Sequence, residues 1–124
     1  MTGAELVARA EAASVKAYAP YSRYRVGASL VTRDGRVFDG VNVENAAYPL
    51  GVCAERTAIA KAASEGVRPG DVAAIGITAS PCGGCRQWLY EWRIELVAFR
   101  RVDGSLAEYG ADELLPDTWD LPEA

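Results

Sequence analysis

Apolar residues recur at helical spacing in two alanine-rich parts of the chain. The first follows Thr2 and stops before Pro20, and Thr2 with Glu5 has the pattern of a capping box at a helix start. The second stops before Gly66, a residue type common just after helix C-termini. Together with two shorter segments, these patterns predict helices at 2–19, 52–65, 86–92 and 111–115.

The segments between these helices have the patterns of strands. Val26, Ala28 and Leu30 form one side of an alternating pattern, and the mostly apolar segment 72–78 is typical of a strand buried on both faces. An Asp-Gly pair at 34–35 is the two-residue signal for a hairpin between the first two strands. We expect strands at 25–32, 36–43, 72–78, 94–99 and 106–109.

The resulting order of elements is α-β-β-α-β-α-β-β-α. It predicts an α/β fold in which helices cover both faces of a mixed sheet, because strands separated by a helix are usually parallel neighbours. The chain has 124 residues, of which 50% are hydrophobic and 24% charged, and this length suffices for one hydrophobic core. No internal repeat or linker is visible, so we expect a single domain over residues 1–124.

The charge balance disfavours several partners. The chain has 13 basic and 17 acidic residues, a net charge of -4 and a pI near 4.8. These values predict no general attraction to nucleic acid or to anionic lipid. The longest apolar runs are far shorter than a bilayer span, and the N-terminus lacks the pattern of a secretion signal. We therefore expect a cytoplasmic protein that binds neither nucleic acid nor membranes.

Two residue counts restrict the chemistry. The chain contains no histidine, which excludes a Ser/His/Asp triad, a Cys/His dyad and any metal site that uses imidazole. It contains three cysteines, and an odd number without a secretion signal favours free thiols, metal ligands or a reactive cysteine over disulfides.

The three cysteines lie where helix N-termini are expected, at positions 53, 82 and 85. A helix N-terminus stabilises a thiolate over a thiol, and thiolates are good ligands for Zn²⁺. Because no fourth cysteine and no histidine are available, a carboxylate or a solvent molecule must complete a tetrahedral site. A site of three protein ligands and one water is typical of catalytic zinc.

Glu55 lies two residues after Cys53, on the first turn of the same expected helix. Its carboxylate can reach a zinc-bound water without binding the metal, which is the position of a general acid and base. The matching reaction is hydrolytic loss of ammonia. Three thiolates on Zn²⁺ give the metal and its ligands a net charge of -1, and the neighbouring Arg56 is placed to offset it.

Simpler interpretations exist for each residue. A Cys-x-x-Cys pair alone is more often redox-active or incidental than catalytic, and Glu55 or Arg56 on a first turn can simply be exposed to solvent. The combination of Cys-x-Glu at one helix start with Pro-Cys-x-x-Cys at a later one favours zinc catalysis over these interpretations.

This combination resembles the zinc-dependent deaminases, including their variant with three cysteines. Three segments, at 21–28, 42–51 and 53–58, are similar to the small cytidine deaminases, and the resemblance covers nearly the whole chain. It implies hydrolysis of cytidine and 2′-deoxycytidine to the uridine forms, as expected for pyrimidine salvage. It also implies a three-layer α/β/α sandwich with a mixed five-stranded sheet, assembled as a homotetramer with shared active sites.

The resemblance also assigns roles to individual residues. It implies that Cys53, Cys82 and Cys85 bind zinc, that Glu55 shuttles protons and that Arg56 hydrogen-bonds a ligand sulfur. For the nucleoside it implies that the backbone of Ala54 contacts the base. Residues expected to bind the sugar hydroxyls are Asn42 and Glu44, which are two positions apart at a strand end and therefore point the same way.

Three positions depart from the family pattern. Tyr24 stands where a phenylalanine commonly stacks near the substrate, and Trp119 stands where a phenylalanine reaches the site of a neighbouring subunit. We expect Trp119 to stack on the substrate of that neighbour, although an indole that only anchors the tail is the alternative. The connection from Thr78 to Pro81 is shorter than is usual in the family, which affects one wall of the expected pocket.

Three other functions remain open at this point. A deaminase of a related aminopyrimidine nucleoside, such as blasticidin S, would share the zinc motif, although a sugar-binding pair suits a free sugar. A structural zinc or thiol-redox module would use the cysteines without hydrolysis. Deamination within a polynucleotide is disfavoured by the net charge and by the lack of a basic tract.

Overall fold

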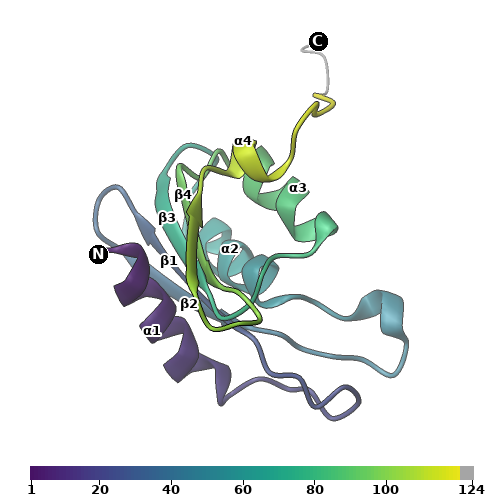
Figure 1. Cartoon of the computed structure of the whole chain (residues 1–124). Coiled ribbons are helices and arrows are strands. Elements are labelled where there is room, and N and C mark those ends of the chain that lie inside the picture. Colours follow the sequence, from purple (N-terminus) through teal and green to yellow (C-terminus); the bar gives the residue numbers. More distant parts are fainter. Residues whose placement is uncertain (121–124) are drawn as a thin grey trace.

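A mixed sheet of five strands forms the middle layer of the molecule (Figure 1). The structure is a computed structural model that describes residues 1–120. The expected domain also includes residues 121–124, which lie outside the described residues. In the order β2-β1-β3-β4-β5, only β3 and β4 are parallel neighbours and the other pairs are antiparallel. The strands are β1 (Gly27–Thr32), β2 (Val37–Val41), β3 (Val72–Ile77), β4 (Leu96–Arg100) and β5 (Leu106–Tyr109).

Helices cover both faces of this sheet, which confirms the predicted fold class (Figure 1). Leu6 of α1 packs with Val31, whereas Leu30, the neighbour of Val31, packs with Ile59 of α2. Because successive strand residues point to opposite faces, α1 and α2 lie on opposite sides of the sheet. The helices are α1 (Gly3–Ser14), α2 (Ala54–Ser64), α3 (Gly83–Glu91) and α4 (Ala111–Leu114).

The first helix starts as predicted but is shorter. The Thr2 and Glu5 side chains form the expected reciprocal capping box. The helix ends at Ser14 rather than at residue 19, because the next N–H groups bond three residues back and Tyr18 then pairs with Val43. The backbone pairing between distant segments therefore ends the helix before Pro20 does.

Two other boundaries differ from the sequence prediction. The connection between β1 and β2 has four residues, 33–36, rather than two; the Thr32 N–H bonds the Arg36 carbonyl at 2.8 Å across it, and Gly35 adopts a φ of 92°. The third helix begins at Gly83 instead of Arg86, since the Cys82 side chain caps it by accepting from the Cys85 N–H. The helix therefore includes both glycines of the Cys-x-x-Cys motif.

The second helix lies directly against β2 at Gly40. A side chain at this position would collide with the backbone of Ala54 and Ala58, so the helix approaches the strand as closely as the backbones allow. This contact sets the height of α2 above the sheet and therefore the position of its N-terminus, which carries Cys53. Within residues 1–120, none of the helices has both the length and the apolar composition needed to cross a membrane.

Candidate metal centre and substrate site

The three cysteine sulfurs come together at the N-termini of two helices. Cys53 is the N-cap of α2, Cys82 is the N-cap of α3, and Cys85 lies on the first turn of α3. All three sulfur atoms lie within 4.8 Å of one another, and none of the thiols is in a disulfide. The predicted placement of the cysteines at helix starts is therefore confirmed.

This spacing fits a zinc ion. Tetrahedral zinc with bonds of about 2.3 Å to sulfur requires sulfur–sulfur distances of about 3.8 Å, which agrees with the observed separation after a small adjustment. The three side chains range from buried Cys85 through half-buried Cys53 to exposed Cys82, so one side of the cluster faces solvent. The arrangement provides three ligands and leaves room for a fourth one from outside the protein.

The environment of the sulfurs favours a thiolate at Cys53. The side-chain hydrogen bond from Cys85 lowers the pKa of Cys53 to about 6, although burial opposes the shift. The same contact and burial raise the pKa of Cys85. This contact therefore favours a thiolate at Cys53 and a protonated Cys85, and a metal cation would displace that proton on binding.

Glu55 is the charged side chain that the fold buries most completely among residues 1–120. Only 4% of its surface is exposed, and it lies on the first turn of α2, two residues from Cys53. Burial raises the pKa of Glu55, and the nearby negative charge of Cys53 adds to this effect. A raised pKa makes a carboxylate a stronger base, which favours a role in proton transfer.

Arg56 brings a positive charge to the same cluster. Its guanidinium lies against Gly84, between Cys82 and Cys85, where a side chain would leave no room for it. Burial by itself would lower the pKa of Arg56, but the contact with Cys85 and the charges of the sulfurs outweigh this effect and raise it. The Nε atom is buried and has no hydrogen-bond partner in the described part of the chain. An unpaired donor beside three sulfurs fits a site that carries excess negative charge.

Asn42 and Glu44, the two residues expected to bind the sugar, hold a loop of their own chain. The Asn42 side chain accepts from the Val26 N–H at 2.8 Å and donates to the Tyr24 carbonyl at 2.8 Å. The Glu44 carboxylate accepts from the N–H groups of Tyr21 and Ser22 at 2.9 and 3.0 Å. Both side chains therefore fix the segment 21–26 and retain only part of their bonding capacity for a ligand.

Ser22 and the segment around Tyr48 belong to this region and were not singled out from the sequence. Tyr48 begins a short 3₁₀ helix, η1 (Tyr48–Leu50), and packs edge-on against Tyr21 with ring centroids 6.3 Å apart. A hollow of about 330 Å³ borders Glu44 here. The residues that line this hollow, which we call the Glu44 hollow, are Tyr21, Ser22, Glu44, Asn45, Tyr48 and Gly51.

The remaining predicted site residues lie in different surroundings. Ala54 is fully buried as the first residue of α2, while Tyr24 and Trp119 are 62% and 71% exposed. The chain after α4 leads away from the body of the molecule, and the Tyr90 hydroxyl fixes it by bonding both carboxylate oxygens of Asp120 (Figure 1). The structure of one chain therefore presents the Trp119 indole to solvent and brings it to no site of its own.

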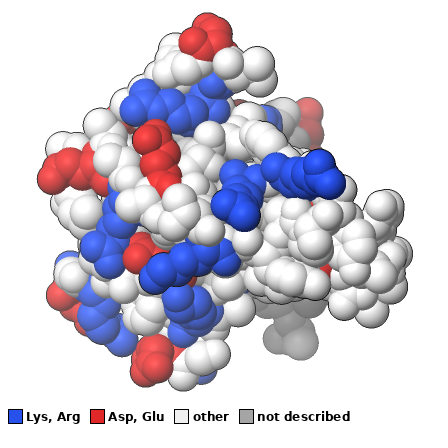
Figure 2. Space-filling view, turned by 90° about the horizontal axis from the view of Figure 1, so that it is seen from below, with Lys and Arg blue, Asp and Glu red and all other residues white. Residues whose placement is uncertain are grey.

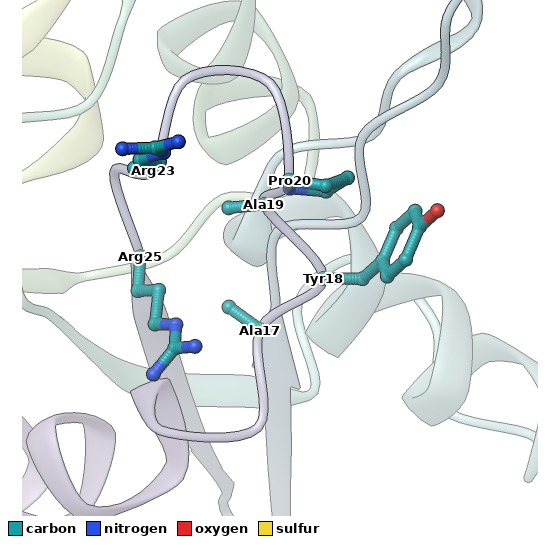
Figure 3. Close-up of a pocket in the computed structure, with 6 residues that line it drawn as sticks. All are labelled: Ala17, Tyr18, Ala19, Pro20, Arg23 and Arg25. Atoms are coloured by element: carbon teal, nitrogen blue, oxygen red, sulfur yellow. The ribbon is translucent and has the colours of Figure 1, made fainter.

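A second hollow, of about 580 Å³, is formed by the 17–25 segment. The guanidinium groups of Arg23 and Arg25 lie on one side of this segment, and the Tyr18 ring points to the other side (Figure 3). None of the predicted site residues lines it. The surface beside the η1 segment has few charges (Figure 2), and several large apolar side chains are exposed there, namely Tyr21, Val43, Tyr48, Leu50 and Val52.

Comparisons with known proteins identify relatives of this chain. Residues 2–100 match the family model for the cytidine and deoxycytidylate deaminase zinc-binding region. The cytidine deaminase of Halalkalibacterium halodurans is 45% identical over 119 residues, which cover 90% of this chain and 89% of that protein. A probable cytidine deaminase of Dictyostelium discoideum is 44% identical over 105 residues, covering 81% and 71% of the two chains.

Solved structures agree with this sequence similarity. The crystal structure of cytidine deaminase from Burkholderia pseudomallei aligns with a TM-score of 0.89 and 46% identity, covering 96% of this chain and all of that chain (100%). The cytidine deaminase structure from Mycobacterium tuberculosis aligns with a TM-score of 0.82 and 34% identity, covering 98% and 99%.

Proposed function

We propose, from the premise that this chain belongs to the cytidine and deoxycytidylate deaminase family, that it hydrolyses cytidine and 2′-deoxycytidine to uridine and 2′-deoxyuridine with release of ammonia. The observation that carries the proposal is the buried carboxyl group of Glu55 on the helix that begins at Cys53, one of three clustered cysteine sulfurs. This geometry provides a metal site and a proton-transfer group within one turn of helix. Both are needed to replace an amino group by an oxygen atom from water.

Cys53, Cys82 and Cys85 would hold the zinc ion, which would supply a Lewis acid that makes water a stronger nucleophile. Glu55 accepts the proton that the attacking water loses. It delivers this proton to the ring nitrogen as the carbon–oxygen bond forms. It then takes the second proton from the new hydroxyl group and passes it to the amino group, which leaves as ammonia when the carbon–nitrogen bond breaks and the carbonyl forms. The raised pKa of Glu55 suits both directions of transfer.

Arg56 adjusts the charge around the sulfurs. Three thiolates carry more negative charge than one Zn²⁺ neutralises, and the guanidinium beside Gly84 supplies a compensating positive charge. This compensation keeps the metal a stronger electron acceptor than three thiolates alone would allow.

The nucleoside is bound by residues that precede α2 in the chain and by the first residue of α2. Asn42 and Glu44 bind sugar hydroxyls with the bonding positions that their contacts to the 21–26 segment leave open. The backbone of Ala54 contacts the base, and the exposed ring of Tyr24 stacks near it.

A homotetramer with shared active sites is part of the proposal. Support comes from the exposed apolar surface beside η1, where Tyr48 is 77% exposed, and from the outward position of Trp119. Both features gain hydrophobic burial if a second copy of the chain covers them. We assign the protein to pyrimidine salvage in the cytoplasm, where free thiols such as these stay reduced.

One assay tests this function directly. Purified zinc-loaded protein is incubated with cytidine, 2′-deoxycytidine, free cytosine and blasticidin S, and ammonia release is measured. We expect turnover of the first two compounds and none in a Glu55→Gln variant. Turnover of blasticidin S alone would redirect the assignment to an antibiotic deaminase, and stoichiometric zinc without turnover of any substrate would favour a non-catalytic zinc module.

A further inference from the structure

The carboxylate of Glu44 is bound mainly by Ser22 and its neighbour. Its Oε1 atom accepts from two backbone N–H groups, those of Tyr21 at 2.9 Å and Ser22 at 3.0 Å. Its Oε2 atom accepts from the Ser22 hydroxyl. The segments that meet here are 22 residues apart in sequence, so this contact is tertiary rather than local.

The hydrogen-bond count leaves Glu44 one free acceptor position. A carboxylate has about four acceptor sites, two on each oxygen. Two are used on Oε1 and one on Oε2, and the fourth, also on Oε2, remains. The single proton of the Ser22 hydroxyl is already committed to Glu44, so Ser22 cannot itself donate to a ligand.

Glu44 is held in its ionised form by the same contacts. The hydrogen bond from the Ser22 hydroxyl is the largest cause that lowers the pKa of Glu44 below its usual range. The carboxylate is therefore only an acceptor at neutral pH, and the group that fills its free position must be a donor such as a hydroxyl.

Ser22 also connects Glu44 to the loop that carries Tyr24. The Ser22 hydroxyl oxygen accepts from the Tyr24 N–H at 3.0 Å. Between these two residues, Arg23 adopts a φ of 60°, a left-handed conformation that is costly for a residue with a side chain. The hydroxyl of Ser22 therefore stabilises a strained turn and the orientation of the carboxylate together.

We propose that Ser22 is a positioning residue for sugar recognition, which fixes the Glu44 carboxylate so that one acceptor position on Oε2 borders the Glu44 hollow and receives one sugar hydroxyl of the nucleoside. This inference rests on the proposed function, because it requires a nucleoside ligand. Without the Ser22 hydroxyl, the carboxylate has two open positions on Oε2 and is held only by the two N–H bonds to Oε1. The contact with the sugar hydroxyl is then weaker and less specific.

Calorimetric binding measurements on the zinc-loaded protein test this inference, with Glu55→Gln present in wild type and variants alike so that the ligands are bound but not deaminated. The ligands are cytidine and its 2′-, 3′- and 5′-deoxy analogues, each of which lacks one sugar hydroxyl. We expect Ser22→Ala to raise the Kd of cytidine by about tenfold, as is typical for loss of a hydrogen bond that involves a charged group. One of the three analogues should bind wild type and Ser22→Ala equally, because it lacks the hydroxyl that Glu44 accepts.

Matched variants separate positioning from folding. Ser22→Thr keeps the hydroxyl and should restore binding to within about twofold. Ser105→Ala removes a hydroxyl that similarly bonds a carboxylate, Asp103, in the β4–β5 turn, and should change no Kd. All variants should keep stoichiometric zinc.

The outcomes distinguish the two proposals. Binding without ammonia release by the wild type would overturn the proposed function, while the Kd values still decide the role of Ser22. An equal loss of affinity for cytidine and for all three analogues in Ser22→Ala would show only a general loop effect and would overturn the inference. An unchanged Kd of cytidine, or failure of all four ligands to bind the wild type, would overturn it as well.

Discussion

Val43 and Val52 exchange both of their backbone hydrogen bonds, each 2.9 Å long, as an isolated antiparallel pair. Antiparallel pairing brings the preceding residue of one segment opposite the following residue of the other, so Asn42 comes opposite Cys53. A residue proposed to bind the sugar and a proposed zinc ligand are therefore held in register by backbone geometry. The backbones of these two residues are therefore fixed relative to each other by the Val43–Val52 pair.

Replacing Glu55 by glutamine should abolish turnover without removing zinc. The amide keeps the size of the buried side chain but cannot accept and return a proton, so the rate should fall by about 10³-fold or more. Ammonia release and zinc content measure the two effects. Glu65→Gln, at the other end of α2, is the control and should remain active. Substantial turnover by Glu55→Gln would refute the proton-transfer role.

Replacing Cys82 or Cys85 by alanine should remove the metal itself. Two remaining thiolates hold zinc much more weakly than three, and ligand loss also removes the charge that attracts the cation. Zinc content after gel filtration measures the effect, with Ser80→Ala as a control in the same connection. Stoichiometric zinc in either cysteine variant would show that the ligands are misassigned.

Arg56→Gln should shift the pH dependence of activity. Without the guanidinium, the charge of the thiolates reaches the metal undiminished, and the metal then acidifies water less strongly. The pH at which activity develops should therefore rise, while zinc binding is partly retained. A profile of kcat against pH, compared with that of the surface variant Arg36→Gln, tests this, and identical profiles would count against the role of Arg56.

Trp119→Ala should weaken substrate binding and leave zinc bound. Stacking of a base on an aromatic ring contributes about 1–3 kcal/mol, so KM should rise by about 5- to 150-fold. If the indole acts in a neighbouring subunit, mixing this variant with Glu55→Gln should restore activity in hybrid sites that combine an intact Glu55 with an intact Trp119. A fully active monomer at micromolar concentration, observed by sedimentation, would contradict shared sites.

Asp39→Asn should destabilise the fold at neutral pH by about 1 kcal/mol, because Asp39 pairs with Arg9 at 2.8 Å and accepts from buried Ser29 at 2.6 Å. Burial would raise the pKa of Asp39, but the bonds from Ser29 and Arg9 outweigh it and lower the pKa below 3.8. The stabilisation is therefore present above pH 3.8 and is lost as the pH falls through the lowered value.

Urea unfolding of wild type and Asp39→Asn at several pH values measures this stabilisation. The two curves should approach each other at acidic pH, and Glu91→Gln, on the exposed part of α3, should match the wild type throughout. A difference in stability that is independent of pH would show that the charge of Asp39 is not its cause.

The positions of the cysteines were predictable because helix N-termini have strong local signals. Cys53 and Cys82 act as N-caps, and the alanine spacing after Cys53 identified α2 without tertiary information. The position of Glu55 on the first turn of α2 followed from its spacing of two residues from Cys53, whereas its burial became visible only in the structure.

The contacts between distant segments were not predictable in the same way. The end of α1 depends on the pairing of Tyr18 with Val43, and the state of Glu44 depends on Ser22. Neither contact leaves a spacing pattern in the sequence, because the partners are 25 and 22 residues apart. The start of α3 was placed three residues late because two adjacent glycines look like a helix break, whereas the Cys82 cap stabilises the helix through them.

Because α2 lies so close to β2 at Gly40, the metal centre depends on a strand residue outside the site itself. A single added methyl group at Gly40 would push the backbone of Ala54, and with it Cys53 and Glu55, away from β2. Random mutagenesis scored by zinc content should therefore find substitutions of Gly40 among the variants that lose zinc. This strand residue touches neither the metal nor the nucleoside. The metal centre therefore also requires that no side chain be present at position 40, a requirement that a list of its metal-binding and catalytic side chains would not include.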